Sequence, residues 1–230
     1  MNSYPQVTSS AAAPTRRAVA KAVAWSVPAV AVTAPAPAVA ASRPCAPVMM
    51  AWSAMGSSSV SSGQKATVGG TTVTYTNTGA TGAPRNSTLT TGNVGGIPAG
   101  QGLALTCPNA TSTTAQTIAF SFSSPVTNVS LTIADIDWDN SAFQDRIVIN
   151  TPGFSGVRGS QITGSGTAAS PYQAVSSVSG GVPNTSSAGN VTVTWAGPLT
   201  QLSMTYDQGG IVSGGPFVAV SGLTFTPTVC

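Results

Sequence analysis

Histidine and glutamate are missing from this sequence, and charged residues of any kind make up only 6% of its 230 residues. Soluble domains usually carry roughly 25% charged residues, so Ser, Thr, Asn, Gln and Gly must cover most of this surface. Without His, a Ser-His-Asp triad, a Cys-His pair and a His-based metal site are excluded. Two aspartates acting as acid and base, as in glycoside hydrolysis, are the remaining catalytic option. The composition therefore favours a protein that binds or builds over an enzyme.

The sequence also lacks an unbroken apolar stretch of the about 20 residues that a membrane span needs. Its longest apolar segment, residues 22–41, is interrupted by prolines. The basic pair Arg16-Arg17 precedes this segment, and the small residues of 38–42 end it. A charged region, an apolar region and a small-residue cleavage site stand here in the order of an export signal. We therefore expect residues 1–41 to be a signal peptide and the cleaved protein to have no membrane attachment.

The route of export is indicated by the paired arginines. Together with Thr15 before them and Val19 after them, they resemble a twin-arginine signal, and the general secretory route is the alternative. The run from Arg16 to Pro28 also resembles the leader of exported surface proteins of the actinobacterial type. This resemblance covers the leader alone and implies a secreted protein, free or associated with the cell wall.

The formal net charge of +3 belongs to the leader. Removing residues 1–41 takes away three of the eight basic residues and none of the five acidic ones, which leaves a neutral body. Nucleic-acid binding needs a clustered basic face. We therefore expect no nucleic-acid partner.

Three cysteines are present, and none of them has the CxxC spacing of a zinc site. In an exported protein they predict one disulfide and one spare thiol. Three pairings are possible. We favour Cys45–Cys230, because the first and last strands of a sandwich often lie side by side, and this choice leaves Cys107 as the spare.

Short runs of alternating apolar and polar residues, separated by Gly, Pro, Asn and Ser, dominate the body of the chain. Such a pattern predicts an all-β protein with one face of each strand in a core. We expect residues 42–230 to form a single antiparallel β-sandwich, jelly-roll-like, with about 8–11 strands. The strands are expected within residues 48–60, 72–76, 116–123, 126–136, 146–150, 190–195, 199–206, 217–221 and 223–226.

Four of the five acidic residues fall within the eleven residues 135–145, from the end of one predicted strand to the start of the next. If the backbone stays extended, alternation places the first three carboxylates on one side. Calcium accepts six to eight oxygen ligands, so it is the candidate cofactor. The alternative is a polar hairpin in which Asp caps turns and Asp137 or Asp145 pairs with Arg146. The predicted calcium ligands are Asp135, Asp137, Asp139, Asn140 and Asp145.

The same region carries a second resemblance. Pro125-Val126, Asn128 and the strand that runs into Asp135-Ile136-Asp137 resemble a β-sandwich module of bacterial adhesin-type surface proteins. The similarity extends over about residues 115–226. It implies an extracellular setting and adhesion, cell-wall association or ligand binding, without naming a ligand.

Sandwich modules bind sugars with exposed aromatic rings and a few polar groups. Trp138 lies within the acidic loop, and Tyr172 and Tyr206 lie near Gly-rich turns. Trp138 and Tyr206 are the predicted ligand-binding residues, whereas Trp195 is expected in the core. The predicted partner is a cell-wall or extracellular polysaccharide. A structural subunit that assembles through its neutral faces is the alternative, and an Asp-based glycoside hydrolase is the third reading.

Overall fold

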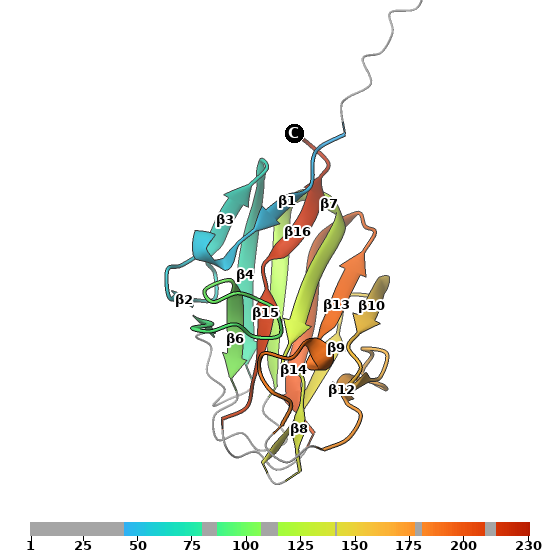
Figure 1. The fold of residues 1–230 in the computed structure, drawn as a ribbon. Coiled ribbons are helices and arrows are strands. Elements are labelled where there is room, and N and C mark those ends of the chain that lie inside the picture. The colour runs from blue at the N-terminus through green and yellow to red at the C-terminus, as the bar shows by residue number, and fades with distance from the viewer. Residues whose placement is uncertain (1–43, 80–86, 107–114, 141, 178–180, 210–214) are drawn as a thin grey trace, which may run out of the picture. The chain divides into compact units, whose positions relative to one another are not determined.

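The computed structural model describes residues 44–79, 87–106, 115–140, 142–177, 181–209 and 215–230. The predicted leader and Cys107 lie outside these residues. The unit Pro44–Cys230 is compact and consists of antiparallel strands (Figure 1). The prediction of an all-β antiparallel sandwich is confirmed. The described part contains sixteen strands, more than predicted, because turns divide the edges of the sandwich into segments of two or three residues.

The strands are β1 (Val48–Met50), β2 (Ser59–Val60), β3 (Lys65–Val68), β4 (Thr71–Gly79), β5 (Ser87–Leu89), β6 (Gly102–Thr106), β7 (Gln116–Ala134), β8 (Trp138–Asp139), β9 (Phe143–Ile149), β10 (Phe154–Arg158), β11 (Ile162–Thr163), β12 (Tyr172–Ala174), β13 (Val191–Trp195), β14 (Leu199–Gln208), β15 (Phe217–Ser221) and β16 (Leu223–Pro227). Two short 3-10 helices accompany them, η1 (Trp52–Ala54) and η2 (Ser187–Gly189).

One strand, β7, belongs to both layers of the sandwich. Its first half lies between β4 and β14, and β14 continues the layer through β9 and β12. Its second half pairs with β13 on one side and with β15 and β16 on the other. β13 continues to β10, and β15 continues to β6 and β5. The two layers are therefore continuous through a single 19-residue strand.

A bulge in β7 shifts its alternation by one residue. Between Thr127 and Ser130, β7 has one residue more than the matching stretch of β16, which pairs Thr226 with Thr127 and Thr224 with Ser130. Asn128 sits in this bulge with a φ of 51°, a left-handed conformation that Asn tolerates well. The shift keeps apolar side chains facing the core along the whole strand. The buried residues are Ile118, Phe120 and Phe122 before the bulge and Val129, Leu131 and Ile133 after it.

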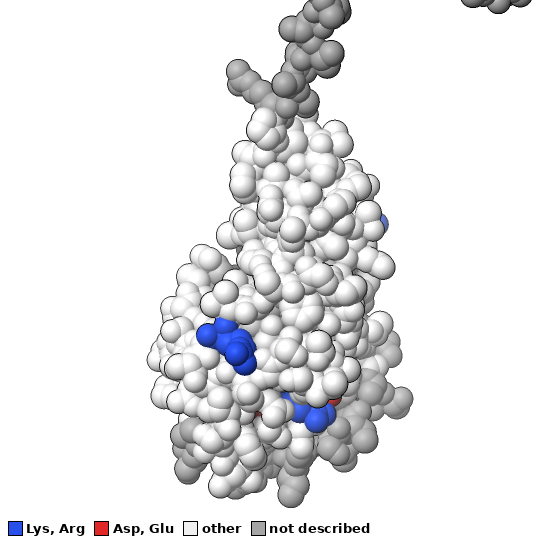
Figure 2. Space-filling view, turned by 90° about the vertical axis from the view of Figure 1, so that its right-hand side faces the viewer, with Lys and Arg blue, Asp and Glu red and all other residues white. Residues whose placement is uncertain are grey.

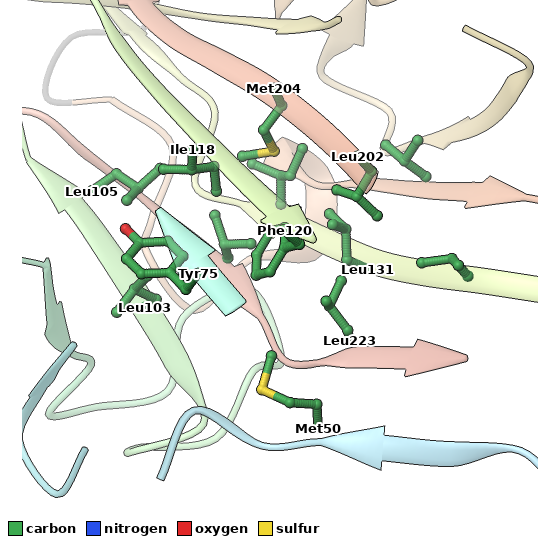
Figure 3. Close-up of a cluster of buried hydrophobic side chains, with 14 of the residues drawn as sticks. Met50, Tyr75, Leu103, Leu105, Ile118, Phe120, Leu131, Leu202, Met204 and Leu223 are labelled. Carbon is green, nitrogen blue, oxygen red and sulfur yellow. The ribbon is translucent and has the colours of Figure 1, made fainter. Parts of the chain in front are cut away.

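The core between the layers is a single large cluster of apolar side chains. Phe120 packs against Trp52 and Tyr75, with ring centroids 5.6 and 5.8 Å apart. Figure 3 shows further side chains of both layers meeting around Phe120, among them Met204 and Leu223. The buried indole of Trp52 donates to the carbonyl oxygen of Val220 at 2.8 Å, so its polar group is satisfied inside the core.

Hydroxyl pairs between directly opposite residues connect neighbouring strands on the outer faces. They take the place that ion pairs have on more charged sheets, because cross-strand Thr pairs stabilise a sheet through hydrogen bonds and side-chain contact. The pairs are Thr67–Thr72, Thr117–Thr205 and Thr132–Thr192, each with 2.9 Å between the oxygens, and Ser155–Thr194, with 2.7 Å.

The predicted disulfide between Cys45 and Cys230 is confirmed, with a Cα–Cα distance of 5.7 Å. The reasoning behind it is confirmed too, because β1 pairs antiparallel with β16, the last strand. The bond closes a loop with a sequence separation of 185 residues. Such a bond is consistent with an extracellular protein.

Removing this bond is expected to lower the free energy of unfolding by about 3–5 kcal/mol, because a long loop is released in the unfolded chain. The measurement is urea unfolding of the Cys45→Ala/Cys230→Ala variant. Cys107 is replaced by Ser in both proteins compared, so that no new pairing forms. Equal midpoints for the two proteins would contradict the expectation.

Candidate functional site

The predicted acidic cluster lies where β7 ends and the β8–β9 hairpin begins. Its carboxylates do not form one solvent-facing row. Asp135, Asp137 and Asp145 are buried, with 6%, 5% and 0% of their surface exposed. Asp139 is half-buried and Asn140 is exposed. The loop departs from extended geometry at Asp135, whose φ is 66°, so the alternation on which the predicted row depended does not continue through it.

Asp145 is held in a buried hydrogen-bond network. Its Oδ1 accepts from the hydroxyl of Tyr206 and from Nε2 of Gln208, both at 2.7 Å. Its Oδ2 accepts from the backbone N–H of Asp137 at 3.3 Å. Complete burial raises the pKa of Asp145 well above the usual range, although the hydrogen bonds from Gln208 and Tyr206 oppose this effect. The carboxyl ties the β8–β9 hairpin to the end of β14.

Asp137 lies beside Asp145 and connects the hairpin to the segment that precedes η2. Its Oδ2 accepts from the backbone N–H of Val182 at 2.8 Å, and a β-carbon at Gly181 would come within 2.2 Å of the same oxygen. Burial raises the pKa of Asp137, whereas hydrogen bonds from Asp145 and from Val182 lower it. Two buried carboxyls this close cannot both be ionised at low cost, so the pair favours a shared proton.

Asp135 has no such network. Its carboxyl makes no hydrogen bond with any residue in the described part of the chain. Burial raises its pKa to about 7, and the neighbouring charge of Asp137 adds to the rise. A carboxyl in this position is costly to ionise at neutral pH.

The structure does not bring the five predicted calcium ligands together. Asp145 already accepts hydrogen bonds on both oxygens, and Asn140 lies on the surface. Among the described residues, no three His, Cys, Asp or Glu side chains are grouped as a metal centre would require. Calcium binding therefore stays a prediction.

The alternative prediction, an ion pair between Arg146 and a carboxylate of the acidic cluster, is wrong. Arg146 does not pair with Asp137 or Asp145. Its Nε and Nη2 donate to the two carboxylate oxygens of Asp207 at 2.8 and 3.0 Å. Arg146 and Asp207 are opposite each other on β9 and β14, which the sequence spacing did not indicate.

The two predicted ligand-binding aromatic residues differ in their exposure to solvent. Tyr206 cannot be a platform, because it has no exposed surface and its hydroxyl donates to Asp145. The alternation of β14 points it into the core. Trp138 is half-buried in the short β8–β9 hairpin, opposite Gln144, so its role stays a prediction. Trp195, expected in the core, is only 2% exposed.

A groove that no sequence pattern indicated lies between β9, β10 and the loop before β12. Its volume is about 820 Å3, within the range of small-molecule sites. Figure 2 shows the side of the molecule that carries β10 and β12, with few charged atoms on an otherwise uncharged surface. The residues that line the groove include Asn150, Phe154, Gly156, Arg158, Ala168 and Tyr172.

Tyr172 is fixed in the wall of this groove by two glycines. A β-carbon on Gly156 would lie 2.0 Å from the Tyr172 hydroxyl oxygen, and one on Gly166 would lie 2.4 Å from the ring. Phe154 packs edge-on against Tyr172 with centroids 6.5 Å apart, and Phe154 also contacts Trp195 at 6.3 Å. The aromatic wall is therefore continuous with the core. The sequence signal that could have located it is the glycine-rich segment before Tyr172.

The buried carboxyls predict an unusual pH dependence of stability. A folded-state pKa raised from 3.8 to about 7 means that the native state binds more protons than the unfolded state, so stability falls as pH rises between these values. Asp135 alone accounts for at most about 4 kcal/mol. The melting temperature is expected to be higher at pH 4.5 than at pH 8, and less pH-dependent in Asp135→Asn, because the amide does not ionise. Asn suits this position because it tolerates the left-handed backbone.

The opposite order of melting temperatures would contradict this assignment. The same melts at pH 8 with calcium and with chelator test the calcium prediction. A bound ion would raise the melting temperature by neutralising the carboxylates that burial penalises.

Comparison with known proteins found no match for this chain. No protein-family model, no curated protein and no solved structure matches the chain. Within the described ranges, no helix is long and apolar enough to cross a membrane.

Proposed function

We propose that this chain is a secreted binding module that holds a polysaccharide in the groove between β10 and Tyr172. The observation that carries the proposal is the lining of that groove. The aromatic residues Phe154 and Tyr172 line it together with the polar residues Asn150, Ser165 and Thr167. Sugars present both C–H faces and hydroxyls, so they favour sites that combine aromatic surface with a few polar groups.

Preorganisation supports the same proposal. The ring of Tyr172 is confined between Gly156 and Gly166, and the ring of Phe154 packs against Trp195. Little side-chain freedom is therefore lost when a ligand binds, which favours affinity. The groove volume of about 820 Å3 would accommodate a short stretch of sugar units.

Binding is a better fit to this groove than hydrolysis. The residues that line it include no acidic side chain. The neighbouring carboxyls of Asp137 and Asp145, at the β8–β9 hairpin, are 5% and 0% exposed, so a glycan could not reach them. An Asp-based hydrolase would need two accessible carboxyls on either side of a bond.

The proposed location outside the cell rests on two features of the chain. The twin-arginine-like leader fits export, and the Cys45–Cys230 disulfide fits an oxidising compartment. A cell-wall or extracellular polysaccharide is then the partner that such a module would meet.

The proposal is tested by filling the groove. Ala168 and Ala169 are adjacent exposed residues between Thr167 and Ser170, but only Ala168 lines the groove. Ala168→Trp is expected to abolish retardation in affinity electrophoresis, whereas Ala169→Trp should migrate as the unmodified protein does. The gels contain dextran, xylan, polygalacturonate or its methyl ester. If no polysaccharide retards the unmodified protein, the proposed function is wrong.

A further inference from the structure

Arg158 brings an uncompensated positive charge to the groove. Three basic residues lie in the described part of the chain, and one of them, Arg146, is paired with Asp207. Arg158 is exposed, and its Nη1 donates to the carbonyl oxygen of Gly164 at 2.9 Å. That hydrogen bond orients the guanidinium but does not neutralise it. A guanidinium has five N–H groups, so most of its donors remain for a ligand.

Tyr172 presents a second unused polar group in the same groove. The residue is only 3% exposed, yet its hydroxyl makes no hydrogen bond with any other residue that the structure describes. The hydroxyl oxygen is not among the fully buried side-chain atoms that lack a partner, so it is open to the groove that Tyr172 lines. The confinement by Gly156 and Gly166 prevents the ring from turning toward another partner. Burial raises the pKa of Tyr172, and the charge of Arg158 opposes this rise only in part, so the hydroxyl keeps its proton and can donate at neutral pH.

We propose that the groove selects a sugar that carries a carboxylate, with Arg158 binding the carboxylate and the Tyr172 hydroxyl donating to a neighbouring sugar oxygen. Guanidinium and carboxylate match in geometry and form charge-assisted hydrogen bonds, which are the stronger kind. No acidic side chain lines the groove to compete for the guanidinium. This inference rests on the proposed polysaccharide binding and names the class of polysaccharide.

The experiment compares two polymers that differ only in the charge of the carboxyl. Polygalacturonate carries free carboxylates, and its fully methyl-esterified form has the same backbone without them. The protein is expected to bind the free acid at least about tenfold more tightly than the ester, and this ratio should decrease as NaCl is added. In Arg158→Gln the ratio should fall to about one.

Three variants control for indirect effects. Lys65→Gln removes an exposed cation from β3, outside the groove, and should leave the ratio as it is. Arg158→Lys keeps the charge without the planar geometry and should retain part of the preference. Tyr172→Phe should weaken binding of polygalacturonate without lowering the melting temperature, because the hydroxyl has no partner in the fold to lose. A drop in melting temperature with unchanged affinity would assign that hydroxyl a structural role and overturn its part in the proposal.

The remaining outcomes separate this inference from the proposed function. Equal affinity for acid and ester would overturn the inference and leave polysaccharide binding intact. Dextran sulfate competing as well as polygalacturonate would overturn the carboxylate assignment, since it would show a site for anions in general. No binding to either polymer or to dextran and xylan would overturn both.

Discussion

The structure depends on the strand that both layers share. Because β7 pairs with five other strands, its position fixes the spacing and register of the two layers together. This arrangement works only if the strand presents apolar side chains to the core over its full length, and the bulge at Asn128 makes that possible. An alternation that continued without a shift would turn Val129, Leu131 and Ile133 toward solvent. The burial of the second half of β7, and with it the pairing of β13 and β15 to that half, depends on this bulge.

The sequence predicted this framework well for a physical reason. A strand that buries one face has alternating apolar and polar residues, and this alternation predicts each half of β7 as a separate strand. What the pattern could not reveal was that they form one strand, because the bulge breaks the alternation where the halves meet. The Cys45–Cys230 pairing was predictable because it follows from which strands are first and last.

The site residues were harder to predict because their roles depend on long-range contacts. Asp137 and Asp145 look like surface ligands in sequence, yet Val182, Tyr206 and Gln208 enclose them from distant segments. Tyr206 was expected at the surface, and its place in the core follows from the alternation of β14. The groove beside Tyr172 arises from β9, β10 and the loop before β12, and no local pattern joins these segments. Glycines at positions 156 and 166 were visible, but their common neighbour was not.

The threonine pairs on the outer faces have a consequence for the environment in which the protein can work. Hydrogen bonds between neutral hydroxyls are not screened by dissolved ions, unlike surface ion pairs, whose contribution fades within a Debye length. One ion pair joins residues of the described part of the chain, so salt has little electrostatic attraction to weaken between the described strands. The stability of the body should therefore vary little between dilute freshwater and brine, a useful property outside the cell, where we propose that the protein works.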